Sequence, residues 1–131
     1  PIVPPSAQPG DPPFIGINDA QMEHATSKTL FIDARSQDEF ECGTIPGAIN
    51  IPFEGLPSEG DLTPYFDSTT GHVAKDHPII VFCSGEECDL STQLARNMMR
   101  CGYSKLAIFF GGAREWEKFG LDMERRKQCG K

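Results

Sequence analysis

A cysteine at the end of a short apolar run is the residue in this sequence best placed to do chemistry. The run from Ile79 to Phe82 carries no charge, Cys83 follows it directly, and a helical pattern begins near Asp89. A side chain between a strand and a helix lies at the sheet edge where open α/β proteins bind ligands. Loop N–H groups at a helix N-terminus stabilise an anion such as the nucleophilic thiolate. Cys83 is therefore a candidate nucleophile, and the alternative is an inert cysteine buried at a strand end.

The stretches around Cys83 alternate between apolar runs and helical patterns. Strands are expected at residues 29–33, 48–51, 79–82 and 106–110. Helices are expected from residue 17, from the capping box at residue 36, and over residues 62–66, 89–100 and 113–119. Such alternation implies βαβ crossovers, so we predict an α/β fold with a central parallel sheet and helices on both faces.

Length and charge restrict the domain organisation and the partners. The chain has 131 residues and a formal net charge of −7, which suits one acidic domain and argues against nucleic acid as a partner. No run reaches the ~18 apolar residues of a membrane-spanning helix, so this segment is not expected to insert into a membrane. The prolines of residues 1–13 predict an N-terminal tail or linker, followed by a domain over 14–128. Residues 129–131 are expected to be a C-terminal tail, and the chain beyond residue 118 to be solvated.

The cysteines do not form a metal-binding pattern. They number five and show no repeated pair spacing: Cys42, Cys83, Cys88, Cys101 and Cys129. Neither a metal nor a cofactor is expected, because the three histidines add no ligand pattern. Most of the thiols are expected to be reduced, which favours a cytoplasmic location. A periplasmic or membrane-tethered location stays open if an N-terminal segment was removed, because the chain starts at Pro1 and not at methionine.

Three stretches taken together resemble the rhodanese-like (sulfurtransferase) domain family. The first begins with the strand-end pair Asp33 and Arg35 and continues as E-F-x-x-G-T-I-P-G-A-I-N-I-P, with Thr44 where the family usually has histidine. The second is Cys83 with its loop and helix. The third is G-G-x-x-x-W-x-x-x-G-L over residues 111–121. The resemblance covers residues 14–123 and implies a rhodanese-like α/β fold whose central parallel sheet has about five strands.

The resemblance also implies a reaction and its residues. The Cys83 thiolate would take the outer sulfur of a small donor or of a persulfide-carrying protein, hold it as a persulfide, and pass it to a thiol or to cyanide. The backbone N–H groups that would hold the terminal sulfur belong to the loop residues Ser84, Gly85, Glu86, Glu87, Cys88 and Asp89. Asp33 and Arg35 are expected to support the site as an ion pair that orders the loops.

The loop departs from the family pattern in length and charge. Familiar single-domain members read C-R-x-G-x-R-S, whereas here the matching serine is Ser91, the loop is longer, and it holds no arginine or lysine. If Glu86, Glu87 and Asp89 face inward, they disfavour a thiolate and repel a dianionic donor, so we expect poor turnover of thiosulfate. The alternative is that the two glutamates are solvated. Phosphatases with this fold place a phosphate-binding arginine where Asp89 stands, so phosphatase chemistry is not expected.

A second thiol inside the loop leaves three functions open. Cys88 is a candidate resolving thiol that could form a disulfide with Cys83, although it could also be a small residue packed under the helix start. The leading hypothesis is a sulfurtransferase. The alternatives are a non-catalytic rhodanese-like interaction module, favoured by the acidic loop, and a thiol redox switch of Cys83 and Cys88. The sequence does not specify the oligomeric state.

Overall fold

The computed structural model describes residues 4–5 and 7–130, and a parallel sheet lies at its centre. In these residues the sheet has five strands in the order β1-β5-β4-β2-β3, and every neighbouring pair is parallel. The bounds are β1 (Phe14–Ile15), β2 (Leu30–Asp33), β3 (Ile49–Asn50), β4 (Ile79–Phe82) and β5 (Leu106–Phe109). All four residues of β4 pair with both β2 and β5, so β4 is the central strand. The predicted α/β fold with a central parallel sheet is confirmed.

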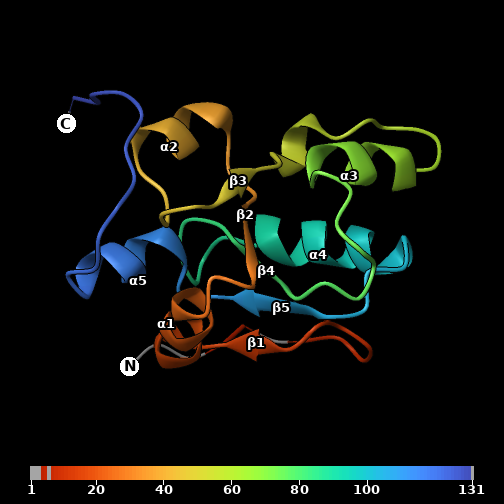
Figure 1. Cartoon of the computed structure of the whole chain (residues 1–131), viewed down its shortest axis with the longest axis horizontal. Helices are drawn as coiled ribbons and strands as arrows, with labels where there is room; N and C mark the ends of the chain where they lie inside the picture. The colour runs from red at the N-terminus through yellow and green to blue at the C-terminus, as the bar shows by residue number, and fades with distance from the viewer. Residues whose placement is uncertain (1–3, 6, 131) are drawn as a thin grey trace.

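Helices cover both faces of this sheet (Figure 1). They are α1 (Ile17–Ala25), α2 (Gln37–Cys42), α3 (Thr63–Thr69), α4 (Leu90–Arg100), α5 (Gly112–Lys118) and the 3-10 turn η1 (Phe53–Gly55). Phe66 of α3 and Leu94 of α4 are buried in the core on one face, and Phe40 of α2 and Trp116 of α5 in the core on the other. No helix in the described part of the chain is both long and apolar enough to cross a bilayer.

The side chains of β4 alternate between these two cores. Ile79 and Val81 belong to the core beneath α4, and Ile80 and Phe82 belong to the core beneath α5. Successive residues of a strand point to opposite faces, and a strand buried on both faces reads as an uninterrupted apolar run. Cys83 continues the alternation, so its side chain lies on the α4 side.

Helix α4 follows the Cys83 loop and has the amphipathic pattern that the sequence predicted. Leu94, Ala95 and Met98 are completely buried on one face, at the spacing of an apolar helix stripe. Asp89 flanks the start of the helix, and Gly102, with a φ of +99°, follows its end. Glycine adopts this left-handed conformation without steric cost, which explains why the helix stops there.

Strand β1 was not expected, and it attaches the end of the proline-rich segment to the domain. The N–H of Ile108 donates to the carbonyl oxygen of Pro13 at 2.8 Å. The carboxylate of Asp11 accepts two hydrogen bonds of 2.9 Å from the guanidinium of Arg96 on α4. Arg96 thereby lowers the pKa of Asp11 below its usual value. The division between tail and domain at residue 14 stays a prediction, but Asp11 and Pro13 contact the folded part.

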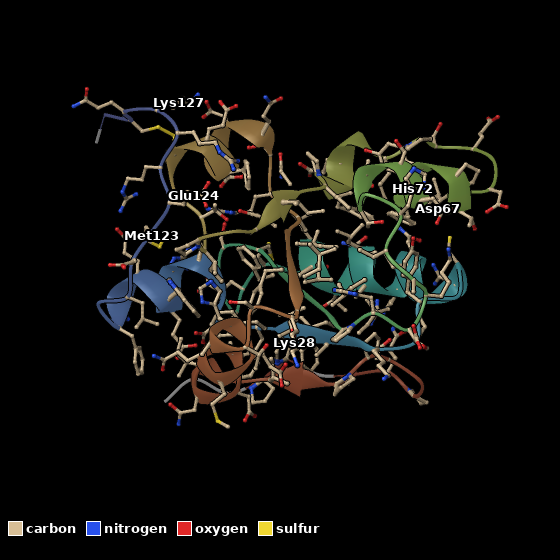
Figure 2. The ribbon with its side chains drawn as sticks, viewed as in Figure 1. Lys28, Asp67, His72, Met123, Glu124 and Lys127 are labelled. Carbon is tan, nitrogen blue, oxygen red and sulfur yellow. A yellow bond between two sulfur atoms is a disulfide. The ribbon has the colours of Figure 1, made fainter. Side chains whose placement is uncertain are left out.

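The C-terminal segment, residues 121–130, runs along α2 instead of projecting into solvent. Figure 2 shows Lys127 of this segment beside α2 and Met123 between α2 and α5. Glu124 pairs with Thr44 in an antiparallel bridge, with N–H···O distances of 3.0 and 2.8 Å. The expectation of a solvated, frayed end after residue 118 is wrong in part: residues 125–130 are exposed, but the segment is held against the domain. Sequence periodicity missed this contact because a single bridge leaves no repeating pattern.

A disulfide between Cys42 and Cys129 fastens the C-terminal segment to α2. Their Cα atoms are 5.6 Å apart, within the range that a disulfide spans. Cys83 and Cys88 also form a disulfide, and Cys101 is a free cysteine. The expectation that most of the thiols are reduced is therefore wrong, and residue 129 is covalently linked to the domain. Spacing alone does not specify which cysteines pair.

Candidate active site

Cys83 lies at the carboxyl edge of the sheet, directly after β4. Phe82 pairs with Asp33 of β2 and with Phe109 of β5, so these three strands end at one level. Cys83 is 1% exposed, and its side chain packs between the sheet and α4. The candidate nucleophile is thus at the sheet edge where parallel α/β proteins assemble their sites.

The loop of residues 84–89 curls back onto the sulfur of Cys83. The Cα atoms of Cys83 and Cys88 lie 6.4 Å apart, and the two side chains are joined as a disulfide. The sulfur of Cys83 is also 3.3 Å from the carbonyl oxygen of Cys88 and 3.4 Å from the hydroxyl oxygen of Ser91. Ser91 is buried in the first turn of α4. Its hydroxyl can donate a hydrogen bond to a sulfur that carries negative charge.

Most backbone N–H groups of this loop are unpaired within the protein. The N–H of Cys88 donates to the carbonyl oxygen of Gly85 at 3.0 Å and closes a turn. In residues 4–5 and 7–130, no acceptor meets the N–H groups of the other loop residues: Ser84, Gly85, Glu86, Glu87 and Asp89. Unpaired N–H groups of this kind can bind an anion. They are the groups that the family resemblance implied for a terminal sulfur.

The acidic side chains of the loop are exposed. Glu86, Glu87 and Asp89 all lie at the surface, while Gly85 between them and Cys83 is buried. Water and salt screen exposed charges, so these carboxylates oppose an anion at the sulfur less than inward-facing carboxylates would. Of the two orientations that the sequence left open, the structure shows the solvated one.

Helix α5 holds the beginning of the loop through its first N–H groups. Ala113 N–H donates to the carbonyl oxygen of Cys83, and Arg114 N–H donates to that of Ser84, both at 2.9 Å. Gly112 has a φ of +67°, and a Cβ at this position would overlap the carbonyl oxygen of Cys83. The second glycine of the G-G-x-x-x-W stretch is therefore required for the close approach of α5 to the Cys83 loop.

Asp33 and Arg35 form a buried ion pair at the end of β2. Asp33 is 0% exposed and accepts hydrogen bonds from Arg35 Nε at 3.0 Å and Nη2 at 2.8 Å. The hydroxyl of Thr44 donates to the same carboxylate at 2.8 Å, and Arg35 also donates to the carbonyl oxygen of Gly43. Thr44, which differs from the histidine usual in the family, thus completes the hydrogen bonds of Asp33. The cluster joins the chain before α2 to the chain after it.

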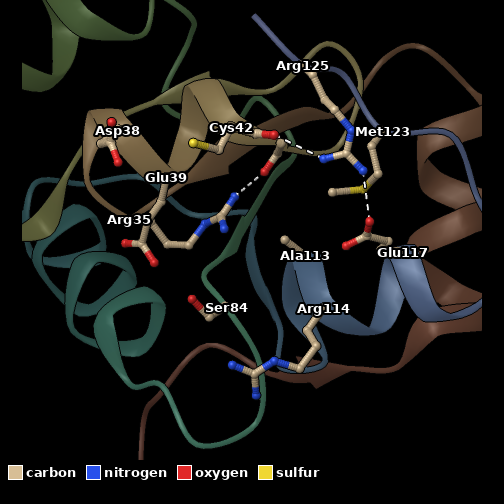
Figure 3. A pocket seen from close by; sticks show the side chains of 11 residues that line it. Arg35, Asp38, Glu39, Cys42, Ser84, Ala113, Arg114, Glu117, Met123 and Arg125 are labelled. Atoms are coloured by element: carbon tan, nitrogen blue, oxygen red, sulfur yellow. Dashed lines mark hydrogen bonds and ion pairs between the residues drawn. The ribbon is translucent and has the colours of Figure 1, made fainter. Parts of the chain in front are cut away.

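A pocket of about 360 Å³ opens beside Ser84, between α2, α5 and the C-terminal segment (Figure 3). Its charged lining residues come from separate parts of the chain, and they are the cations Arg35, Arg114 and Arg125 and the carboxylates Asp38, Glu39 and Glu117. Arg125 is paired with Glu117 at 2.8 Å and with the carbonyl oxygen of Cys42 at 3.0 Å. The loop has no cation of its own, but other parts of the chain bring arginine side chains to this pocket, where three carboxylates balance them in number.

A second pocket, of about 460 Å³, is lined by Gly85 and Glu86 of the same loop and by Arg114 and Glu115 of α5. One carboxylate oxygen of Glu115 is buried and has no hydrogen-bond partner in the described residues. Burial raises the pKa of the Glu115 carboxyl, and the nearby Glu86 carboxylate adds to this rise. No cluster of three or more His, Cys, Asp or Glu side chains suited to a metal ion is present in the part of the chain that the structure describes.

Comparison with known proteins agrees with this geometry. The model of the rhodanese-like domain matches residues 18–119. The chain belongs to the rhodanese-like domain family. The thiosulfate:glutathione sulfurtransferase of Homo sapiens is 31% identical to this rhodanese-like domain over 109 residues, which cover 79% of this chain and 92% of that protein.

Other relatives of this rhodanese-like domain differ in how much of their length it covers. Thiosulfate sulfurtransferase 16, chloroplastic, of Arabidopsis thaliana is 26% identical over 93 residues, which cover 70% of this chain and 76% of that protein. The TBC domain-containing protein kinase-like protein of Mus musculus is 30% identical over 95 residues, but these are 10% of its length. The solved structure of a human single-domain sulfurtransferase has a TM-score of 0.66 at 23% identity and covers 81% of this chain and 96% of that one.

The rhodanese-like domain brings the predicted loop residues together around Cys83, but the sequence reasoning missed Arg114 and Arg125. Arg125 reaches the pocket only because the C-terminal segment folds back along α2. Arg114 had a local signal, since it lies two residues after the G-G pair at the start of a helix. Because the start of α5 packs against the loop, a side chain in its first turn, such as that of Arg114, lies next to the site.

Proposed function

We propose that this protein is a sulfurtransferase that carries sulfane sulfur as a persulfide on Cys83. The observation that supports this most is the loop at the end of β4, whose N–H groups are unpaired and whose far end returns to the Cys83 sulfur. A persulfide is an anion, and such a loop can stabilise it without any metal or cofactor. Relatives named as sulfurtransferases in Homo sapiens and Arabidopsis thaliana support the same reaction class.

The reaction requires the reduced form of the site and proceeds in two displacements. The Cys83 thiolate attacks the outer sulfur of thiosulfate, a new S–S bond forms, and the old S–S bond breaks so that sulfite leaves with the electron pair. A thiolate acceptor then attacks the terminal sulfur, and Cys83 leaves as the thiolate. Glutathione is the acceptor we propose, because the human relative is named for it. The loop N–H groups would hold the terminal sulfur between the two steps.

The persulfide can be detected directly by mass spectrometry. After reduction, a Cys88→Ser variant incubated with thiosulfate is expected to gain the mass of one sulfur, and peptide mapping should place it on Cys83. Glutathione should remove the added mass. The serine variant is used because Cys88 can expel the sulfur from the wild-type protein. Absence of added sulfur with several donors, or its presence only on Cys101, would contradict the proposal and favour an interaction module.

A second candidate function, a thiol redox switch, is supported by the disulfide between Cys83 and Cys88. In this scheme the Cys88 thiolate attacks the Sγ of the Cys83 persulfide. The bond from Sγ to the terminal sulfur breaks, hydrosulfide leaves, and a disulfide remains. Two equivalents of a small thiol would then reduce the disulfide. The switch would protect Cys83 from oxidation and stop sulfur transfer when reductant is scarce.

The switch predicts a specific product when no acceptor is present. Reduced wild-type protein given one equivalent of thiosulfate is expected to release hydrosulfide and to become two hydrogens lighter than its reduced form. Cys88→Ser is expected to release no hydrosulfide and to keep the added sulfur. Cys101→Ser, which alters the free cysteine at the end of α4, serves as the matched control and should behave as wild type. A wild-type protein that keeps its persulfide under these conditions would rule the switch out.

A further inference from the structure

The loop after Cys83 has no cation of its own, but α5 fixes Arg114 beside it. The N–H of Arg114 donates to the carbonyl oxygen of Ser84 at 2.9 Å, so the backbone of this arginine is attached to the loop. Its side chain is exposed and borders both pockets that the loop lines. A substitution of the side chain leaves the backbone hydrogen bond in place. The position can therefore be altered without detaching α5 from the loop.

The guanidinium of Arg114 lies against Gly85. A Cβ at Gly85 would be 3.2 Å from Nη1 of Arg114, which is tighter than ordinary van der Waals contact. Figure 3 shows the arginine side chain extending from α5 toward the loop that contains Ser84. Because residue 85 has no side chain, the guanidinium can pack against the loop backbone at this position, which is two residues after Cys83 in the sequence.

Arg114 also differs from the other arginines in having no acceptor of its own. Each of the others binds a side-chain oxygen: Arg35, Arg96, Arg100, Arg125 and Arg126. In residues 4–5 and 7–130, the Arg114 guanidinium makes no ion pair and no hydrogen bond. Its five N–H donors are thus available to a ligand in the pocket.

In the described residues, Arg114 is paired with none of the acidic side chains that line these two pockets: Asp38, Glu39, Glu86, Glu115 and Glu117. Glu117, in the pocket beside Ser84, is paired with Arg125. Glu115 turns one carboxylate oxygen inward against Gly111, and burial raises its pKa. Glu86 is exposed, and no ion pair joins it to Arg114 in the described residues. An anion that enters from solvent therefore meets an unpaired guanidinium.

We propose that Arg114 is a specificity-determining residue that binds the oxyanion group of the sulfur donor, a sulfonate as in thiosulfate. The inference rests on the proposed function, because it gives a role to Arg114 only if Cys83 accepts sulfur. A guanidinium binds two oxygens of such a group at once, in a geometry that lysine does not reproduce. As the S–S bond of thiosulfate breaks, the electron pair leaves with sulfite, whose negative charge Arg114 stabilises. Arg114 thus replaces, from α5, the cation that the loop lacks.

Steady-state kinetics with two donors can test this role. Thiosulfate carries an oxyanion, whereas the persulfide of 2-mercaptoethanol delivers the same sulfur without one. Arg114→Gln is expected to raise KM for thiosulfate about ten- to a hundredfold, the effect of losing a charge-assisted contact. KM for the 2-mercaptoethanol persulfide should stay within about twofold, since no oxyanion is bound. Arg114→Lys should lie between wild type and Arg114→Gln for thiosulfate alone.

A matched control distinguishes the loss of a donor-binding contact from the loss of one positive charge on the protein. Arg126→Gln removes the same charge from the C-terminal segment, where the arginine pairs with Glu124 and lines neither pocket. It should leave KM for both donors unchanged. The proposal is overturned if Arg114→Gln leaves KM for thiosulfate unchanged or raises KM equally for both donors. It is also overturned if the wild type uses the 2-mercaptoethanol persulfide but not thiosulfate.

Failure of this inference can be distinguished from failure of the proposed function. If Cys83 gains sulfur from both donors in wild type and in Arg114→Gln with equal KM, Cys83 transfers sulfur and Arg114 has no role in donor choice. If no donor loads Cys83 in the wild type, both the proposed function and the inference fall. Circular dichroism of Arg114→Gln and Arg114→Lys should match wild type, because the α5–loop hydrogen bonds belong to the backbone.

Discussion

Replacing Cys83 with serine is expected to lower the rate of sulfur transfer at least about a thousandfold. A serine hydroxyl is not ionised near neutral pH and cannot hold sulfane sulfur as a persulfide. The substitution is nearly isosteric in a side chain that is 1% exposed, so the fold should be kept. The rate is measured as formation of sulfite from thiosulfate with glutathione as acceptor, in protein reduced beforehand.

Two further variants make this result specific. Cys101→Ser should retain the wild-type rate, because Cys101 is the free cysteine at the far end of α4. Cys88→Ser should also turn over when glutathione is abundant, since an external thiol can take the sulfur in place of Cys88. A Cys83→Ser protein that still transfers sulfur would show that another thiol is the carrier. It would remove the chemical basis of the proposed function.

Removing the carboxylate of Asp33 is expected to destabilise the protein by about 3–5 kcal/mol. Asp33→Ala leaves the guanidinium of Arg35 buried without its anion and the hydroxyl of Thr44 without its acceptor. An unpaired buried charge is costly because it has lost water and gained no partner. The free energy of unfolding is measured by urea denaturation without reductant, so that the disulfides stay intact.

Two further variants test this prediction even if Asp33→Ala does not fold. Asp38→Asn breaks the ion pair of Asp38 with Lys127, where the acidic side chain is 73% exposed, and should cost less than about 1 kcal/mol. Thr44→Val removes one hydrogen bond from Asp33 and should cost about 1–3 kcal/mol, because it leaves the buried carboxylate under-paired. If Asp38→Asn and Thr44→Val lower the free energy of unfolding equally, the buried Asp33 cluster contributes no more to stability than an exposed ion pair, and the prediction is contradicted.

The elements around Cys83 could be predicted because their signals are local. The apolar run before the cysteine became β4, and the helical spacing after it became α4, with starts and ends close to those expected. β1 could not be predicted in this way. Its two residues, Phe14 and Ile15, form a strand only because they pair with the edge of β5, and so short a segment has no period to recognise.

The charge around the site could not be predicted from the loop alone. The loop sequence led to the expectation of poor thiosulfate use, because it contains glutamates and no arginine. In the folded chain these glutamates are exposed, and Arg114 reaches the loop through the docking of α5. The rate with thiosulfate is still a prediction. The electrostatic environment of Cys83 depends on tertiary contacts that no single stretch of sequence contains.

The disulfide between Cys42 and Cys129 gives the chain a closed covalent ring. The two cysteines are 87 residues apart, and β3, β4, β5 and the Cys83 loop all lie inside the ring. The exposed loop at residues 57–61 is the kind of segment that proteases cut, and it belongs to the same ring. A single cut there opens the ring without dividing the molecule, because the two pieces stay joined through sulfur. On a denaturing gel such a nick would remain hidden until the sample is reduced.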